Sequence, residues 1–504
     1  MIEEDKTIKN FYSGQITVFM LMLFMIVSSV LIAQYHSAVY YACRADSERA
    51  GRLSVDSLLA GYVKPLKERY QILAFDGGFG EKEFSQEKIN GELLDVYKKN
   101  IQSSVDKKNI INSTLDESLF TMLIENDWRF LLREITLNRV EFVREDGLET
   151  LMKMLKDKNN EASDTLQEER QEAERASQEE TSESEEDKED GENEEKEHVD
   201  DPRDIVTDIW DRGILYAACP GEYQISDKEC SMGDVSYPES GQEMQGEIDF
   251  KDEESIQGMF KKWDNIFDSD NMLKGTVEDA AAVWYMEEVF HNGTTHLKDS
   301  SDNYERVLEY EIEYIIAGNE KDEENLKSVL WRLLALRCVM NLSHILLSPE
   351  KQMQVTETAG VIGAALVIPY FIGVIAFLLK ATWAFAESLS DCRALLRGKK
   401  VPIIKSDATW HLTWERMLSL NVNMLDGYEG NEGMTYEDYL KIFLLIQNRN
   451  EKYRRMTHLI EKNIRLQNEY SNFYLKNCIY GVQVTFQNEF SVGENYKVQT
   501  GLSY

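Results

Sequence analysis

A stretch without charge near the N-terminus constrains this chain more than any other feature. No Asp, Glu, Lys or Arg occurs from Phe11 to Cys43, and the part from Ile16 to Ala33 consists almost entirely of Val, Leu, Ile, Met and Phe. A helix of this length crosses a hydrocarbon core of roughly 30 Å, and it satisfies its own backbone hydrogen bonds in lipid. We therefore predict a transmembrane helix over residues 15–36, preceded by a short cytoplasmic segment at 1–14.

A cleaved secretory signal is the alternative to an anchor, and the orientation of the anchor is a separate question. A cleaved secretory signal has an apolar core of about 7–15 residues and a small-x-small cleavage site, and the run here is longer and lacks such a site. The charges do not define the orientation of the span, because lysines precede it and arginines follow it. The flanking basic residues are Lys6 and Lys9 on one side and Arg44, Arg49 and Arg52 on the other.

The helical pattern does not stop at the end of the apolar run. It continues to about Lys67, with no proline before Pro65, so we expect one long helix that leaves the membrane as a stalk with coiled-coil character. This stalk opens the outer domain, the first part of which we place at 37–158. The expected packing stripe on the stalk consists of Leu53, Leu58, Leu59 and Tyr62.

Charge is extreme and unevenly distributed. The chain carries a formal charge of −36, which repels phosphate backbones, so we expect no nucleic-acid partner. Residues 161–201 hold 20 Asp and Glu against 4 Lys and Arg, with almost no apolar side chain. Such a segment cannot bury enough surface to fold alone, and we interpret 159–203 as an acidic low-complexity insertion. A cation-binding or wall-binding tail is the alternative.

The remaining sequence predicts mostly helix with some strand. Residues 85–158 show amphipathic helical spacing, followed within that range by a short strand candidate at Val140–Val143. Helices are expected again near Val277 and from Glu324 to Leu347, and Gly481–Phe486 alternates apolar and polar residues as a half-buried strand does. The predicted fold class is α+β, mostly helical, with 204–504 as the second part of the outer domain and strands at its C-terminal end.

A second apolar segment at 359–379 leaves two alternatives open. It contains no charge and is long enough to span a membrane, and basic residues follow it. It also contains Gly360, Gly363, Pro369 and Gly373, which suit close packing of helices inside a domain. The segment is therefore either a second membrane span or an apolar helical hairpin buried in the outer domain.

The six cysteines are too few and too scattered for a disulfide scaffold. Cys219 begins a turn-like Cys-Pro-Gly stretch that is able to return the chain to Cys230. If the domain is extracytoplasmic, these two thiols form a candidate disulfide. Two unpaired thiols are the equal alternative.

No catalytic or metal-binding arrangement emerges from the sequence. Ser348–Lys351 has Ser-x-x-Lys spacing without the companion motifs of acyl-enzyme hydrolases and is better explained as a helix end. Gly77–Gly80 lacks the Lys of a phosphate-binding loop and predicts a turn. His291 and His296 flank a turn without a third ligand, and Asp268–Asn271 lacks the later ligands of a calcium loop. We expect no enzyme activity, no cofactor and no metal.

Several blocks resemble a known family. Ser13–Phe19, where a glycine and a polar residue open directly into the apolar helix, is similar to the start of TadE/TadG-like proteins of Tad (Flp) pilus assembly. The order of the later blocks is similar to an uncharacterised family of large Firmicute membrane proteins that accompany such pilus genes. Those blocks are Ala45–Ala50, Asp56–Tyr62, Arg69–Asp76, Tyr310–Leu326, Trp383–Lys405 and Tyr436–Leu440.

The resemblance implies a role in building a cell-surface appendage. Pilins of this class are cut after a glycine and carry Glu at the fifth position of the mature chain. Here Gly14 and Gln15 preserve a remnant of the cleavage position, but the fifth residue is Phe19. The resemblance with this departure implies an unprocessed, non-polymerising accessory protein, with the N-terminus inside the cell and the main domain outside.

Two functions follow as hypotheses. The first is a membrane-anchored structural protein of a Tad-like pilus or related secretion apparatus, whose partners are the membrane and other pilus or envelope proteins. The second is a cell-surface adhesin or sensor that acts as a binding module.

Overall fold

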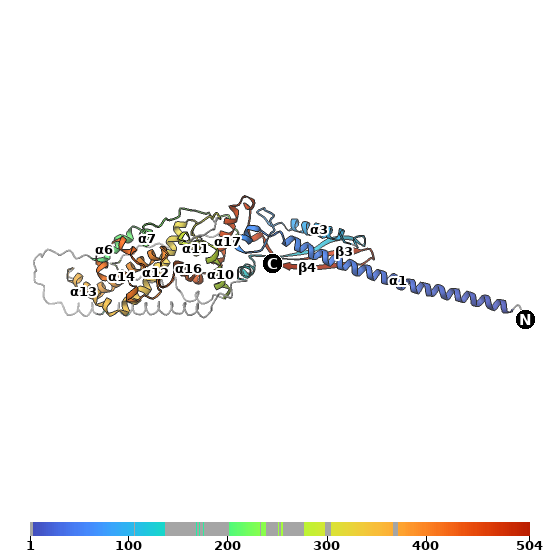
Figure 1. The fold of residues 1–504 in the computed structure, drawn as a ribbon, viewed down its shortest axis with the longest axis horizontal. Helices are drawn as coiled ribbons and strands as arrows, with labels where there is room; N and C mark the ends of the chain where they lie inside the picture. Colours follow the sequence, from blue (N-terminus) through green and yellow to red (C-terminus); the bar gives the residue numbers. More distant parts are fainter. Residues whose placement is uncertain are drawn as a thin grey trace, which may run out of the picture. The chain divides into compact units, whose positions relative to one another are not determined.

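The chain folds into two compact units (Figure 1). Unit 1 comprises Met1–Leu131 and Glu469–Tyr504, and unit 2 comprises Leu132–Asn468. The computed structural model describes residues 4–104, 106–136, 201–231, 233–237, 277–297, 304–365 and 371–504, with a few isolated positions between them. The predicted class, α+β and mostly helical, is confirmed, and the C-terminal residues join the N-terminal ones in a single unit.

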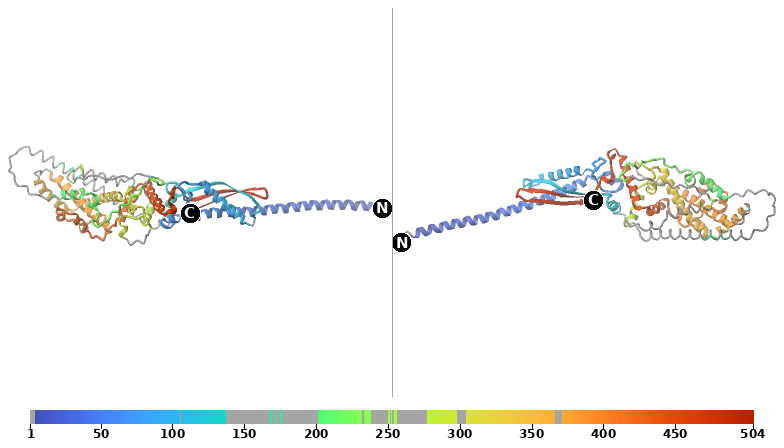
Figure 2. Two further views of the ribbon diagram at one scale, coloured as in Figure 1. Left: turned by 90° about the horizontal axis from the view of Figure 1, so that it is seen from above. Right: turned by 180° about the vertical axis from the view of Figure 1, so that it is seen from behind.

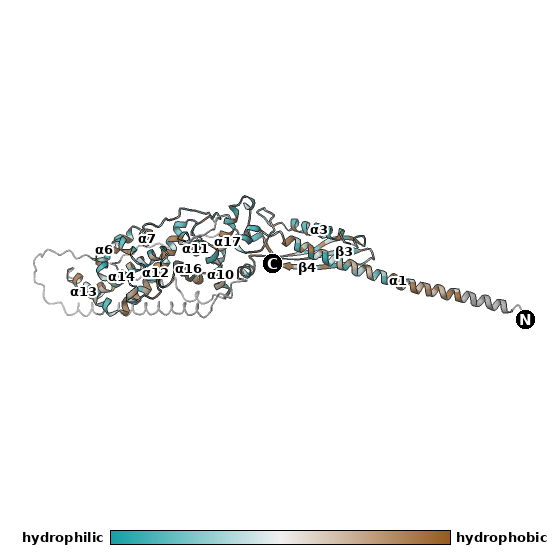
Figure 3. Ribbon diagram, viewed as in Figure 1, coloured by the Kyte–Doolittle hydropathy of each residue, from teal (hydrophilic) through white to brown (hydrophobic). Residues whose placement is uncertain are grey.

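One continuous helix, α1 (Glu4–Leu59), forms the N-terminal part of unit 1. Its apolar first half contacts no other part of the described chain: Phe24 and Met25 are 69% and 68% exposed, and the most apolar window of the helix is 0% buried. In Figure 3 brown, hydrophobic residues cover the helix next to its grey N-terminal end. A bare apolar helix of this length is a candidate membrane span.

The long helix ends earlier than the sequence pattern suggested. It stops at Leu59 instead of near Lys67, and a short helix, α2 (Lys64–Tyr70), begins after a turn at Gly61. Pro65 occupies the first turn of α2, where its missing N–H costs no helical hydrogen bond. The proline therefore starts a new helix and does not continue α1.

An antiparallel sheet fills the rest of unit 1. Strand β3 (Cys478–Phe490) is central, with β2 (Ile110–Met122) on one side and β1 (Phe75–Asp76) and β4 (Asn495–Ser503) on the other. The strand predicted at Gly481–Phe486 is confirmed within β3. Segments from opposite ends of the chain thus share one sheet.

The prediction of helix throughout 85–158 is wrong for β2. Helix α3 (Gln86–Gln102) has the expected amphipathic spacing, with Ile89, Leu93 and Tyr97 buried on one face, but the chain then enters β2. Register shifts against β3 interrupt the strand near Ile110 and near Leu115. Bulges of this kind break the two-residue alternation that identifies a strand in sequence.

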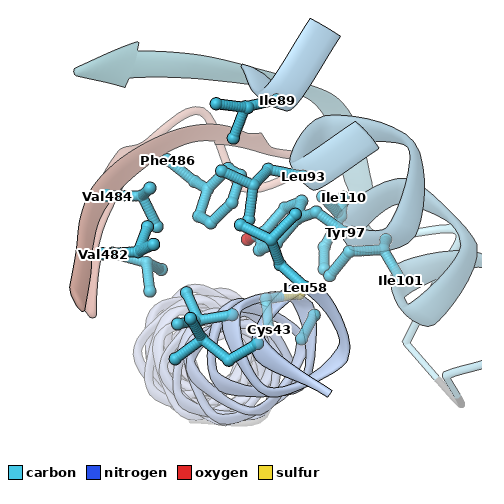
Figure 4. Close-up of a cluster of buried hydrophobic side chains, with 14 of the residues drawn as sticks. Cys43, Leu58, Ile89, Leu93, Tyr97, Ile101, Ile110, Val482, Val484 and Phe486 are labelled. Atoms are coloured by element: carbon cyan, nitrogen blue, oxygen red, sulfur yellow. The ribbon is translucent and has the colours of Figure 1, made fainter. Parts of the chain in front are cut away.

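The core of unit 1 lies where the second half of α1 and helix α3 pack on the sheet (Figure 4). Tyr97 stacks on Phe486 with ring centroids 4.0 Å apart. The predicted stripe is correct for Leu58 and Leu59, which are buried, and wrong for Leu53, which is 40% exposed. The stalk is not a coiled coil in the described structure, because α1 packs against strands and α3 together.

Figures 1 and 2 show this half of α1 running beside β3 and β4 in every view. Contacts between the helix and the residues of β4 and the C-terminus occur along the whole of this half. Tyr40 packs on Tyr496, Gly51 approaches Val498, and the Tyr504 hydroxyl donates to the carbonyl of Leu59. A Cβ at Gly51 would lie 3.1 Å from Val498, so the small residue allows this close approach.

Unit 2 is helical. Short helices precede its core: α6 (Pro202–Asp211), α7 (Ile214–Ala218), α10 (Val277–Val289) and α11 (Glu311–Ala317). The core helices are α12 (Asp322–Leu347), α13 (Pro349–Ala365) and α14 (Ile372–Leu396), followed by α15 (Trp414–Leu418), α16 (Tyr436–Ile446) and α17 (Arg449–Arg465). Helix α4 (Arg129–Thr136) lies at the boundary of the two units. Short 3-10 helices occur in unit 2 at Thr295–Leu297, Asp407–Thr409 and Val422–Asp426, at its end at Asn468–Tyr470, and in unit 1 at Leu475–Asn477.

The helices predicted near Val277 and over Glu324–Leu347 are confirmed by α10 and α12. Ser348 ends α12 and Pro349 begins α13, as expected for the Ser-x-x-Lys stretch, and Gly77–Gly80 forms a turn. The strand predicted at Val140–Val143, nearly all of the acidic insertion at 159–203 and the stretch Asp268–Asn271 lie outside the described residues.

The single apolar helix predicted at 359–379 is corrected, because the segment is divided between the end of α13 and the start of α14. These two helices pack against each other. Three helices, α1, α12 and α14, are long and apolar enough to cross a membrane, but the apolar windows of α12 and α14 are each 83% buried by protein. The apolar window of α14 is thus covered, whereas Val361 and Phe371 of the predicted segment are 56% and 47% exposed, and the choice between a buried hairpin and a second span stays a prediction.

Candidate functional site

The pilin-like remnant lies on the bare half of α1. Gly14 and Gln15 belong to the helix, and the Phe19 side chain is 65% exposed. From Ile16 to Ala33 the helix presents no carboxylate, because the sequence contains none there. The helix therefore offers an apolar surface to lipid or to another helix, with no acidic group at the fifth position after Gly14.

Unit 2 contains a polar cleft with a volume of about 550 Å³. Three short segments form its walls: the loop after α7, the turn after α10 and the residues just before α11. Its lining combines both signs of charge with amide, hydroxyl and imidazole groups. The lining residues are Glu222, Gln224, Ile225, Ser226, Asp227, Lys228, His291, Asn292, Thr295, His296, Glu309 and Tyr310.

Asp322, in the first turn of α12, holds two of these walls together. Its carboxylate accepts hydrogen bonds from the Ser226 hydroxyl at 2.6 Å and from the backbone N–H groups of Glu309 and Tyr310 at 2.8 and 3.1 Å. Burial raises the pKa of Asp322, although these three donors oppose the shift. A carboxylate that crosslinks two loops fixes the width of the cleft between them.

The charged rim of the cleft is arranged around Glu309. The Lys228 ammonium lies 2.6 Å from one carboxylate oxygen, and Nδ1 of His291 lies 3.9 Å from the other. Lys228 also donates to the carbonyl of Arg306 at 2.9 Å. His296 is exposed, as expected for a loop histidine, whereas His291 is partly buried in the cleft wall. A cleft with paired charges can orient a polar or zwitterionic ligand.

Glu313 of α11 lies buried behind the turn that carries the cleft histidines. Its Oε1 accepts from the N–H of Gly293 at 2.8 Å and from the Tyr436 hydroxyl at 2.9 Å, while Oε2 has no hydrogen-bond partner among the described residues. Burial raises the pKa of Glu313 to about 7, and the charge of Asp322 adds to the shift. The carboxyl therefore exchanges its proton near neutral pH.

Gly293 is the residue that allows this contact. A Cβ there would lie 2.6 Å from the Tyr223 hydroxyl and 3.2 Å from Oε1 of Glu313. The Tyr223 hydroxyl donates to the carbonyl of Gly293 at 2.8 Å. Both backbone groups of the glycine are used, so any larger side chain would separate the turn from the carboxyl.

A second polar centre of unit 2 is fully buried. Arg337 of α12, Glu387 and Asp391 of α14, and Lys405 have side chains that are 0% exposed. Arg337 and Lys405 lie 2.9 and 2.6 Å from Asp391, and Lys405 also pairs with Glu387. Burial alone would raise the pKa of Asp391, but the charges of Arg337 and Lys405 outweigh it and hold the pKa below its usual range.

This ionic cluster fastens the segment after α14 to the helix pair. Glu387 accepts from the backbone N–H groups of His411 and Leu412, both at 2.8 Å. Arg337 donates to the carbonyls of Pro402 and Ile403 at 2.8 and 2.9 Å. Each charged group has an ionic partner, and Arg337 and Glu387 also bond to the backbone, which is the condition under which buried charges are tolerated. We interpret the cluster as structural.

The structure shows where the remaining predicted residues lie. Cys219 and Cys230 are both buried and both free thiols. Burial raises the pKa of Cys219 to about 12, so the thiolate is a negligible species at neutral pH. Within the described residues, no group of three His, Cys, Asp or Glu side chains is placed to hold a metal ion.

Sequence reasoning missed the groups that organise both polar centres. Asp322, Glu313 and Glu387 lie in blocks that carry the family resemblance but no chemical motif, and their partners Ser226, Tyr436 and His411 lie in other segments of the chain. The only available signal was a set of charged residues inside otherwise apolar helices. Such residues are rarely buried unless they are paired.

Replacing Lys405 with Met should destabilise unit 2 strongly. The change leaves Glu387 and Asp391 buried with one cation fewer, which costs about 3–5 kcal/mol of unfolding free energy. Urea denaturation followed by tryptophan fluorescence measures it, because Lys405 lies over the Trp410 ring. Lys327→Met is the control: its pair with Glu323 is partly exposed and contributes at most about 0.5 kcal/mol. Equal losses in the two variants would contradict the interpretation.

Glu313→Gln should change how stability depends on pH. The folded-state pKa of about 7 lies above the ordinary 4.5, so the folded protein binds the proton more tightly. The stability that protonation of the buried Glu313 carboxyl gives the fold is fully present below about pH 4.5 and is lost as pH rises through 7. The variant should therefore gain stability relative to wild type between pH 5 and 8, by up to about 3 kcal/mol. Urea midpoints across this range measure it. Exposed Glu432→Gln should follow wild type, and parallel curves for Glu313→Gln would refute the assignment.

Comparison with known proteins gives one match. Residues 192–490 match the model of a family of unknown function, DUF5702. No curated protein matches the chain, and no solved structure does either. The matched region contains the cleft, the buried ionic cluster and strand β3. Because the match covers more than half of its length, the chain belongs to the family DUF5702.

Proposed function

We propose that this protein is a membrane-anchored structural protein of a Tad-like pilus or related secretion apparatus, unprocessed and non-polymerising. The observation that carries the proposal is the division of α1 into two halves. One half is bare and apolar, and the other half is a wall of the core of unit 1. We call the folded part of unit 1, in which the second half of α1 and α3 pack on the sheet, the headpiece. Because one rigid helix belongs to both the anchor and the headpiece, the headpiece keeps a fixed position relative to the membrane.

The contacts of α1 support a structural role. Apolar side chains at the bare half remain exposed, with Ile16 at 63% and Phe24 at 69%. In water such a surface would be costly, whereas in lipid or against other apolar helices it is stabilising. Above it, Cys43, Ala50, Val55 and Leu58 are buried against the sheet and α3. The headpiece therefore cannot reorient freely about its anchor.

The resemblance to TadE/TadG-like proteins supplies the pilus part of the proposal. It rests on Ser13–Phe19 and on the later sequence blocks. Phe19 argues against polymerisation, because pilins of this class use a glutamate there to pair with a freed N-terminal ammonium. Without that carboxylate, an ammonium buried in an apolar helix bundle would cost several kcal/mol.

Orientation completes the proposal. We place the N-terminus inside the cell and, outside it, unit 2 and the part of unit 1 that follows the span, in agreement with the resembling family. A strongly acidic outer domain suits this side, because it neither attracts nucleic acid nor adheres to it. Other pilus or envelope proteins are the expected partners.

A second function is favoured by the polar cleft of unit 2. A cleft of about 550 Å³ with paired charges is large enough for a small polar ligand, and a surface adhesin or sensor would use such a site. Co-purification from membranes followed by mass spectrometry separates the two functions. Pilus components among the partners favour the structural role, and their absence favours the binding module.

The protein should stay in the membrane fraction after high-salt and carbonate washing. An apolar helix of this length is not released when charges are screened. Deletion of residues 15–35 should yield a soluble protein, because Val39 is the first residue of α1 buried in the core. Sedimentation and immunoblotting of both forms measure this. Release of the full-length chain by carbonate would contradict membrane anchoring.

Intact-mass measurement of membrane-extracted protein should show an N-terminus at Met1 or Ile2. Cleavage after Gly14 would give no assembly advantage, since Phe19 offers no partner for the new ammonium. A Phe19→Glu variant should also retain its N-terminus if no processing enzyme acts on this chain. A mature chain that begins at Gln15 would overturn the proposal and identify a processed pilin-like subunit.

A further inference from the structure

One end of unit 1 lies beside the point where α1 passes from bare to packed. Tyr40, near the start of the packed half, contacts the rings of Phe490 and Tyr496 at the hairpin between β3 and β4. Phe490 pairs with Ile110, the first residue of β2, and the Ser491 N–H donates to the carbonyl of Asn109. We call this end the membrane-side rim, defined by residues 98–99, 106–109 and 491–494.

The rim lies close to the end of the apolar run. The run ends at Ala33 and the first buried residue of α1 is Val39, a separation of about 9 Å at 1.5 Å per residue. The headgroup layer on each side of a bilayer is about 5–8 Å thick. If the apolar run fills the hydrocarbon core, the packed half of α1 therefore begins at the outer edge of the headgroup layer, and the rim lies beside that point.

Aromatic side chains mark the same level. Tyr35 and Tyr41 are 63% and 62% exposed, and both lie between the apolar run and Arg44, the first charged residue after it. Tyrosine is enriched where the hydrocarbon core meets the headgroups, because its ring is apolar and its hydroxyl is polar. Beyond the rim, at the start of β2, Ile111 is 63% exposed.

The rim also carries lysines with no acidic partner. In the described structure Lys98, Lys107 and Lys108 are exposed and form no ion pair, while Lys99 pairs with Asp95 at 2.5 Å. The acidic residues of the rim are Asp106, which accepts from the Asn109 side chain at 3.2 Å, and Glu494. Three of the four lysines of the rim therefore carry a charge that no carboxylate of the described structure pairs with.

We propose that the lysines of the membrane-side rim bind the phosphate groups of lipids, so that unit 1 rests on the surface of the membrane that α1 crosses. The inference depends on the membrane anchoring proposed above. Lysines near an anionic surface are attracted within about one Debye length, and several act together. The headpiece would then be fixed at two points, by α1 in the hydrocarbon core and by the rim at the headgroups.

Hydrogen exchange of the full-length chain in nanodiscs tests the proposal. The probe is the set of backbone amides at 106–109, compared in discs of purely zwitterionic lipid and in discs with one third anionic lipid. We expect exchange to be slower by about tenfold in the anionic discs, since the net negative surface charge there draws two or more lysines to the headgroups. The double substitution Lys107→Glu and Lys108→Glu should remove the difference between the lipids.

The matched control changes the same charge elsewhere in unit 1. Lys64→Glu with Lys67→Glu alters exposed residues of α2, beyond the opposite end of the packed helix, and should leave the lipid effect intact. Equal exchange in both lipids, or loss of the effect in the control, overturns the proposal. Equal protection of these amides in detergent also overturns the proposal, because the lysines would then be contacting another part of the chain and not lipid. Carbonate extraction of the same protein reports separately whether the anchor itself fails.

Discussion

The whole of unit 1 depends on one helix that serves two environments. The first half of α1 is stable only where apolar side chains avoid water, and the second half supplies one wall of a protein core. No glycine–proline break separates the halves, so the helix behaves as a single rod of 56 residues. Every other element of unit 1 is placed relative to that rod. The strand β3, from the far end of the chain, is held by it through Phe486, Val484 and Val482.

In unit 2, buried polar groups fix how the elements pack, whereas unit 1 is built on a helix with an exposed apolar half. Asp322 joins the loops of the cleft, and the cluster of Arg337, Glu387, Asp391 and Lys405 fastens α12 and α14 to the segment after them. Such groups add little net stability compared with apolar packing, but they penalise any arrangement that separates them. This explains how helices as apolar as α12 and α14 adopt one packing inside a domain.

The sequence predicted those features that follow from local periodicity. The span, the continuous helix and helices α10 and α12 come from runs of residues that repeat along one segment. Strand β2 was missed because its bulges disturb the alternation, and the end of α1 was misplaced because Pro65 begins a helix. Glu387 and Lys405 were visible as residues, but their pairing depends on tertiary contacts that no single segment encodes.

The proposed anchoring requires α1 to remain one straight helix from its apolar half to its packed half, and a distance along the helix tests this directly. Val27 and Arg52 are both exposed and lie on one face of the helix, and the native cysteines are all buried. Spin labels at Val27→Cys and Arg52→Cys, measured by double electron–electron resonance in a bilayer, should give a single narrow distance of about 38 Å. A broad distribution centred well below this value would show a hinge between the anchor and the headpiece, and would contradict a continuous, straight α1.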